Sequence, residues 1–316
     1  MSEYEQTKNG RTAPNNTTED KFSLTPEDYL AKHHILLYLE DAIQQLLDFK
    51  EDYPKIDPAQ FFQEYFSTLR KGNHTLYREY QFVRATPHNR ASFIRSFWIC
   101  FRQIGKSGDL LNVREYHSLL CLICPNFPLD LVQKTACIIF LEDAMDSLTS
   151  FADFLYAFQL QLYYEEFLDR CSDIYDKLLT TVRSPRGTVY IPSASTNQSA
   201  TTAAAALEGT TMPLEGIAMP LEGLESKHFV DAVMHDMQDI GYRYPPASVL
   251  LDIQSKASRS TFYGFVVALA RSESLNSSIG VLPPRTEVYH DPIEPIRKSS
   301  HSSKRALIKA DKEAPD

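Results

Sequence analysis

The chain has 316 residues, with 32 lysines and arginines against 41 aspartates and glutamates, and a formal net charge of −9. This acidic balance argues against broad binding to nucleic acid or to anionic membranes, because both need a basic protein surface. The sequence holds no run of about 20 apolar residues, the length that crosses a bilayer, and its length suits one large domain or two modest ones.

Residues 1–24 are polar and carry no apolar signal core, so we expect a disordered leader. Five cysteines, an odd number, indicate a reducing, cytosolic compartment. Cys121 and Cys124 have CxxC spacing, but no second pair of Cys or His stands at zinc-ligand distance. We therefore expect both to be packed as small apolar side chains.

Residues 25–72 carry two strong helix starts, each a cap residue followed by proline, at Thr25–Pro26 and Asp57–Pro58. A Thr or Asp oxygen can accept the first amide protons of a helix, and proline fits the first helical position because no donor is needed there. Gly72 is a typical helix stop. The pattern predicts a helical hairpin.

Apolar residues recur at three- and four-residue steps along both helices of this hairpin, which places them on shared helical faces. We predict a protein-interaction surface from these residues: Ile35, Leu36, Leu39, Ile43, Leu46, Phe62, Tyr65 and Phe66. Two helices alone bury too little apolar surface to be stable, so the hairpin must pack on other parts of the chain or on another chain. The first stripe is wider than one partner helix within the hairpin needs, so we expect another chain to bury the surplus. We expect that chain to be a docking-type hairpin of another subunit rather than a second copy. In the alternative, a helix over residues 87–104 covers the surplus.

Further helix starts follow along the chain, and no alternating strand pattern of useful length accompanies them, so the predicted fold class is all-α. They are marked by Thr86 before Pro87, Asn112 with Glu115, and Ser150 with Asp153. The last start opens about thirty residues without Gly or Pro, which predicts one long helix.

Residues 73–180 resemble a pair of EF-hands that has lost its calcium ligands. If Glu115 takes the last ligand position, the first, third and fifth positions fall on Ile104, Lys106 and Gly108, and none of them is a carboxylate. In a second candidate loop, Ala144 stands between Glu142 and Asp146 where a ligand is required. We predict a degenerate EF-hand-like scaffold that binds no calcium and no other metal.

The remaining domain boundaries follow from composition. Residues 181–225 contain a duplicated MPLEG unit, in which Pro and Gly prevent a continuous helix, so we predict a flexible linker there. Residues 226–280 are predicted to form a C-terminal helical segment, and residues 281–316 a disordered tail.

No catalytic motif is found: the sequence has no GxSxG elbow, no glycine-rich phosphate loop and no HExxH. The one polar cluster that could serve an enzyme of unfamiliar type holds Asp109, Arg114, Glu115 and His117. We expect these residues to cap helices and close a loop, so no catalytic or cofactor-binding residue and no cofactor is predicted.

Several blocks carry a resemblance to a known family, in matching order and spacing: YLAKHHILLYLEDAIQQLL, DPAQFFQEYF, FVRATPHNR, GKSGDLL with EYH, DFLYAFQLQLYYEEFLD and STFYGFVVALA. Together they resemble the centriolar satellite-associated tubulin polyglutamylase complex regulator family, over residues 26–179 and about 226–292. The hairpin more loosely resembles the dimerisation and docking domain of protein kinase A regulatory subunits.

The resemblance implies a non-catalytic regulatory or scaffold subunit that restrains tubulin polyglutamylation and supports microtubule organisation at centriolar satellites, centrosomes and cilia. The partners it implies are a tubulin tyrosine ligase-like glutamylase, other subunits of its complex, centriolar satellite proteins, and microtubules directly or through the complex. The leader, the MPLEG duplication and the basic run RKSSHSSKRALIK have no counterpart in this resemblance.

Overall fold

The computed structural model describes residues 25–140, 146–183, 223–237 and 242–290. Over these residues the protein is all-α, which confirms the predicted fold class, and its only strands there are two pairs of two-residue strands. Contacts divide the chain into two compact units, residues 1–93 and 94–316. The disorder predicted for residues 1–24, most of the linker and the end of the tail lies outside the described residues.

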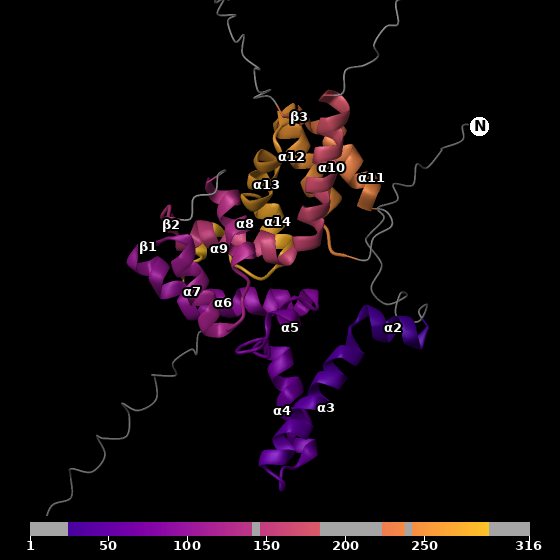
Figure 1. Ribbon diagram of the computed structural model, residues 1–316, viewed down its shortest axis with the longest axis vertical. Helices are drawn as coiled ribbons and strands as arrows, with labels where there is room; N and C mark the ends of the chain where they lie inside the picture. The colour runs from indigo at the N-terminus through magenta and orange to yellow at the C-terminus, as the bar shows by residue number, and fades with distance from the viewer. Residues whose placement is uncertain (1–24, 141–145, 184–222, 238–241, 291–316) are drawn as a thin grey trace, which may run out of the picture. The chain divides into compact units, whose positions relative to one another are not determined.

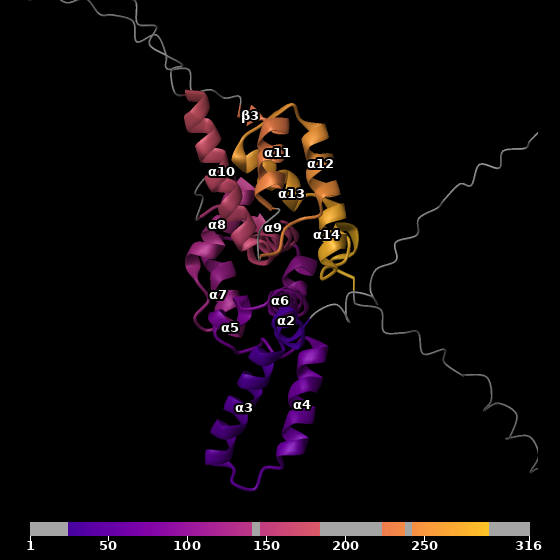
Figure 2. The same ribbon diagram turned by 90° about the vertical axis from the view of Figure 1, so that its right-hand side faces the viewer.

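The first unit contains the predicted hairpin. Its helices are α2 (Pro26–Lys32), α3 (Ile35–Asp52), α4 (Pro58–Lys71), α5 (Tyr80–Arg84) and the first residues of α6 (Pro87–Ser107). The two long helices α3 and α4 lie side by side in both views (Figure 1, Figure 2).

The predicted caps form, but the first helix is not continuous. The Thr25 hydroxyl accepts from the amide of Asp28, and the Asp57 carboxylate accepts from the amide of Ala59. Gly72 ends α4 in the left-handed conformation, with φ 76°. His34 is also left-handed, with φ 53°, and this strained backbone separates α2 from α3.

The second unit begins with two EF-hand-like helix–strand–helix units, which together form the first helix pair. Its elements are α6, β1 (Leu110–Leu111) and α7 (Val113–Ile123), then α8 (Leu129–Phe140), β2 (Thr149–Ser150) and α9 (Phe151–Tyr163). β1 and β2 pair antiparallel, with Leu110 opposite Ser150, so two helix–strand–helix units are joined through their strands. α6 continues through Gly105, where the sequence predicted its end, and stops two residues later.

The same arrangement, two helix–strand–helix units joined through their strands, occurs a second time along the chain and forms the second helix pair. The sequence did not predict it. Its elements are α10 (Glu165–Arg183), β3 (Leu224–Glu225) and α11 (Ser226–Asp236), then α12 (Ala247–Lys256), β4 (Arg259–Ser260) and α13 (Phe262–Ala270). β3 and β4 pair antiparallel, with Leu224 opposite Ser260. Gly223 is needed here, because a Cβ on it would lie 2.0 Å from the carbonyl oxygen of Ser260.

The single long helix predicted after Ser150 is wrong, because α9 ends at Tyr163 and α10 starts at Glu165. Tyr164 lies between them and is buried in the same cluster as residues of α8, α10, α11, α12 and α13. The expected C-terminal helical segment therefore shares one hydrophobic core with α8, α9 and α10 (Figure 1).

The disordered tail was predicted to begin at residue 281, but residues 281–290 are part of the described structure. After α14 (Glu273–Ile279) the chain continues through a short 3-10 turn, η2 (Arg285–Glu287), and both Leu282 and Val288 are buried. Proline suggested disorder, but Pro283 instead offers its carbonyl oxygen to the Tyr156 hydroxyl. Regular structure also extends into both ends of the predicted linker, residues 181–225, since α10 extends to Arg183 and β3 starts at Leu224.

None of the helices in the described ranges is long and apolar enough to span a membrane. Within the same ranges, no group of three or more His, Cys, Asp or Glu gathers as a metal site would require.

Candidate interaction surface

The interior of the hairpin is small. Tyr38 and Ala42 on α3 pack with Tyr65 on α4, and these three residues form the buried cluster between the two helices of the hairpin. The buried stripe of α3 therefore consists of Tyr38 and Ala42, one turn apart, rather than of the leucines and isoleucines that the sequence contains in excess.

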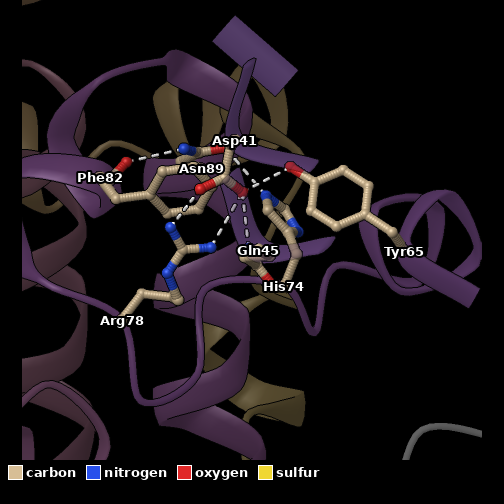
Figure 3. A network of polar contacts seen from close by, with 7 residues as sticks. All are labelled: Asp41, Gln45, Tyr65, His74, Arg78, Phe82 and Asn89. Carbon is tan, nitrogen blue, oxygen red and sulfur yellow. Dashed lines mark hydrogen bonds and ion pairs between the residues drawn. The ribbon is translucent and has the colours of Figure 1, made fainter. Parts of the chain in front are cut away.

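A charged network fixes the hairpin to the segment that follows it (Figure 3). The Asp41 carboxylate accepts hydrogen bonds from both terminal nitrogens of Arg78 and from the Tyr65 hydroxyl, at 2.6 Å for the tyrosine. Gln45 donates to the same carboxylate at 2.8 Å. Arg78 also lies 3.8 Å from the centre of the Phe82 ring. Arginine and carboxylate thus meet in the two-pronged geometry that sets orientation.

A second group of hydrogen bonds joins α3 to the start of α6. The Tyr38 hydroxyl donates to Asn89 at 2.7 Å and lies 2.8 Å from the Thr86 hydroxyl. Asn89 also contacts His74 at 2.8 Å, and its amide nitrogen donates to the carbonyl of Phe82 (Figure 3). Because these residues are buried, their hydrogen bonds select one arrangement of α3 against the segment from His74 to Asn89, within the first unit.

Burial and charge shift the titration of this network. Burial would raise the pKa of Asp41, but the hydrogen bonds from Arg78 and Tyr65 hold it below its ordinary value. Burial, reinforced by the Asp41 carboxylate, raises the pKa of Tyr65. Burial lowers the pKa of His74 to about 4, so this imidazole is neutral at physiological pH.

The other side of α3 carries the apolar residues that the hairpin does not bury. Leu36 is 52% exposed, Ile43 48% and Leu47 54%, and they recur at steps that place them along one side of the helix. Leu39 and, on α4, Phe66 are exposed as well. We call these five residues the hairpin face. Exposed leucines that stand alone are ordinary, whereas several exposed apolar residues on one hairpin are the kind of feature that interaction surfaces are built from.

A groove of about 400 Å³ lies at one end of the hairpin face, beside the break between α2 and α3. Its lining combines an apolar floor with basic and imidazole side chains: His33, His34, Ile35, Tyr38, Leu39, Phe66, Leu69, Arg70 and His88. No carboxylate is among these lining residues.

The predicted surface residues divide into three groups in the structure. Leu36, Leu39, Ile43 and Phe66 are exposed, Ile35, Leu46 and Phe62 are half-buried, and Tyr65 belongs to the core. That the hairpin face binds a partner stays a prediction. The first turn of α6 contacts Tyr38, and the alternative in which the helix over residues 87–104 covers the surplus stays a prediction as well.

Sequence reasoning missed Leu47 and the Asp41 network. Leu47 could have been found, because it follows Ile43 by one helical turn. The network could not, since Arg78 lies thirty-seven positions from Asp41 in the chain.

Three residues of the polar cluster considered for an enzyme have local contacts in the structure. Asp109 accepts from the Ser107 hydroxyl, and Glu115 closes the predicted capping box with Asn112. His117 contacts the carbonyl oxygen of Phe127. These contacts are helix capping and loop closure. Nearby, Cys124 is buried as expected, whereas Cys121 is half-buried.

Comparison with known proteins places this arrangement in a family. The CSTPP1 N-terminal domain matches residues 23–72, the hairpin ending at Gly72. The chain is 44% identical over 273 residues to the bovine protein named centriolar satellite-associated tubulin polyglutamylase complex regulator 1, covering 86% of this chain and 80% of the relative. The human protein of that name is 44% identical and the zebrafish (Danio rerio) protein 41% identical, each with 86% of this chain and 79% of the relative covered.

No solved structure gives a significant match to the chain. The sequence relationship nevertheless extends well beyond the hairpin, because 86% of the chain is covered and both helix pairs lie in the chain after residue 72. The chain belongs to the family of centriolar satellite-associated tubulin polyglutamylase complex regulator 1 proteins.

Proposed function

We propose that this chain is a non-catalytic regulatory and scaffold subunit of a tubulin polyglutamylase complex, and that it restrains the addition of glutamate chains to tubulin. The observation that carries the proposal is the 44% identity, over 86% of the chain, to proteins named as regulators of that complex. The partners are a tubulin tyrosine ligase-like glutamylase and the other subunits. The sites of action are centriolar satellites, centrosomes and the ciliary base, where the chain supports microtubule organisation.

The hairpin face is the surface through which the chain joins the complex. Its exposed leucine, isoleucine and phenylalanine side chains would be removed from water by a second docking-type hairpin, supplied by another subunit. Each fully buried side chain of this kind contributes about 1.5–3 kcal/mol to such an association before its costs are counted. The fixed polar network behind the face supports this role, because it holds α3 and α4 rigid before the partner arrives.

Leu39→Glu together with Ile43→Glu tests the surface. Because both side chains are exposed, the full-length variant should keep its helix content and change in stability by at most about 0.5 kcal/mol per site. It should lose the glutamylase and its companion subunits in affinity capture followed by mass spectrometry. Gln63→Glu is the matched control, since it adds a carboxylate to an exposed position of α4 outside the hairpin face.

Two outcomes would contradict the assignment of the surface. A variant that unfolds would place Leu39 and Ile43 in an intramolecular core. A folded variant that captures the complex as well as wild type would remove the hairpin face from the interface. Sedimentation of the purified wild-type chain should give a monomer, whereas a stable dimer would point to a second copy as the partner.

Removing the chain from ciliated cells tests the regulatory direction. Glutamate chains on tubulin, measured by immunoblot, should increase when a restraining subunit is lost. A decrease that wild-type chain reverses would make the chain an activator instead.

A further inference from the structure

The C-terminal strap, defined as residues 281–290, lies in the second unit and packs on the first helix pair. It forms no long helix and joins no strand pair, since η2 is its only regular element. Leu282 is 6% exposed and Val288 is fully buried, so the strap inserts two apolar side chains six residues apart. The strap is thus held in place by the surface it lies on.

Side chains of that surface bind the main chain of the strap. The indole Nε1 of Trp98 on α6 donates to the carbonyl oxygen of Val288 at 2.7 Å. The Tyr156 hydroxyl on α9 donates to the carbonyl oxygen of Pro283 at 2.6 Å. Hydrogen bonds to main-chain carbonyls, combined with pockets for a few side chains, are a general way to recognise an extended peptide.

Arg285 and Tyr289 add side-chain selectivity. The Arg285 guanidinium stacks 4.3 Å from the centre of the Tyr156 ring and pairs with Asp153 at 3.2 Å. Its other terminal nitrogen donates to the carbonyl of Ala270 at 3.0 Å. Such an arrangement selects arginine, which stacks and donates in one plane.

Gly105 on α6 makes room for the Tyr289 ring. A Cβ on Gly105 would lie 2.0 Å from a carbon of that ring, well inside contact distance. Glycine in a helix is destabilising by about 1 kcal/mol relative to alanine. The helix therefore retains its least favourable ordinary residue where the strap needs a flat, open surface.

The strap does not fill the space available to it. A cavity of about 270 Å³ is bordered by Arg285 together with Asp153 and Ala157 of α9 and residues of α8 and α13. The described residues thus leave room beside the Arg285 position for a longer or bulkier peptide.

We propose that the groove formed by α6 and α9 is a peptide-binding site which the chain closes with its own C-terminal strap. The partner that opens it is an extended segment with the same chemistry: an apolar residue before proline, an arginine two residues after that proline, and a valine-tyrosine pair after the arginine. This inference does not depend on the hairpin face, which lies in the other unit. The competing explanation is that the strap is a permanent part of the core.

Wild-type full-length chain provides the first test. Trp98 is the single tryptophan of the sequence and is bonded to the strap, so its fluorescence reports strap occupancy. In hydrogen exchange, the strap should open independently, with its amides exchanging at least about tenfold faster than those of α9. Exchange of the strap and α9 at one common rate would show that the strap opens only with the core, and would overturn the proposal.

Val288→Asp in the full-length chain provides the second test, because a carboxylate cannot occupy the buried valine site. The variant should stay helical, its Trp98 emission should shift to the red, and it should bind a labelled synthetic peptide of residues 280–291. Wild type, with its groove closed, should bind that peptide at least about tenfold more weakly. Thr286→Asp is the matched control, since Thr286 is exposed on the same strap, and it should behave as wild type.

Gly105→Ala added to Val288→Asp should abolish peptide binding while leaving the helix intact. If Val288→Asp loses helix content, the strap belongs to the core. The same conclusion follows if the variant folds but does not bind the peptide. A dimer of wild type that dissociates on Val288→Asp would mean that straps are exchanged between copies, and would also overturn the proposal.

Discussion

In the second unit, apolar residues from each helix from α8 to α14 share one cluster that extends from Ile138 to Leu275, and most of its members are almost fully buried. In the hairpin, the buried core is Tyr38, Ala42 and Tyr65, and the larger aliphatic residues of α3 lie on the outside. The two regions have similar helical periodicity but use it differently. One region buries its apolar stripe within the chain, and the other leaves it exposed.

The difference shows that a directional polar network can define the geometry of two helices that share only a small apolar core. The second unit is held by apolar burial, which has no preferred direction and grows with area. The hairpin is held by Asp41, Arg78 and Tyr65, whose hydrogen bonds are directional and contribute little net stability but define one geometry. A rigid hairpin with a modest core can therefore keep its leucines available for another chain.

The largest expected difference between the two regions is in the free energy of unfolding that is lost when one large side chain is truncated to alanine. Phe154 is fully buried and stacks on Tyr116, with ring centres 3.8 Å apart. Phe154→Ala should lower the free energy of unfolding by about 3–5 kcal/mol, measured by urea denaturation with Trp98 fluorescence. The matched truncation on the hairpin face, Leu36→Ala, should change it by less than about 0.5 kcal/mol. Equal effects of the two truncations would contradict the comparison.

A smaller effect is expected from the charged network. Asp41→Asn leaves the partly buried Arg78 without its charge partner and should destabilise the hairpin by about 1.5–3 kcal/mol. Hydrogen exchange of residues 35–71 measures this loss, and the amides of α9 should not change. Asp48→Asn, at an exposed carboxylate of the same helix, is the control. If Asp41→Asn exchanges like wild type, the network does not hold the hairpin.

The pH dependence of the network has a defined sign. Asp41 has a lowered pKa when folded, so the stability it contributes is present above its ordinary pKa of about 4 and is lost as pH falls through the folded value.

The most gradual effect, spread over several pH units, comes from His74 at acidic pH. The pKa of His74 is lowered from 6.5 to about 4 in the folded chain, so the unfolded chain binds a proton first as pH falls through this window. The hairpin should lose at most about 1.4 kcal/mol per pH unit between these values. Hydrogen exchange of residues 35–71 at several pH values, corrected for the intrinsic exchange rate, measures the slope. His74→Gln should flatten it, whereas His33→Gln, at an exposed position, should not; a slope that survives His74→Gln would assign it to another group.

Local signals in the sequence predicted local structure well. Thr25, Asp57, Asn112 and Ser150 all cap helices as expected, because a cap requires only a side chain and an amide two or three residues away. The break at His34 and the break at Tyr164 were missed. Neither carries Gly or Pro, and Tyr164 is placed by the core that buries it.

The sequence predicted which apolar residues belong to the candidate surface, but not which of them would be buried and which exposed. The three-and-four spacing identified the apolar residues of α3, yet it could not tell which stripe would face α4. Tyr38 was selected for the interior because its hydroxyl reaches Thr86 and Asn89, which lie about fifty positions later in the chain. That choice turned Leu36 and Ile43 outward.

By itself the sequence determined the all-α class, the helix starts and the set of apolar residues on the hairpin, because each follows from interactions within a few residues or one helical turn. Only the tertiary structure decided that a second helix pair forms around β3 and β4, that the strap packs on Trp98, and that the hairpin keeps its leucines outside. These features depend on residues that are far apart in the chain. Which of several apolar stripes is buried is then decided by shape and by hydrogen-bond partners, which no local pattern specifies.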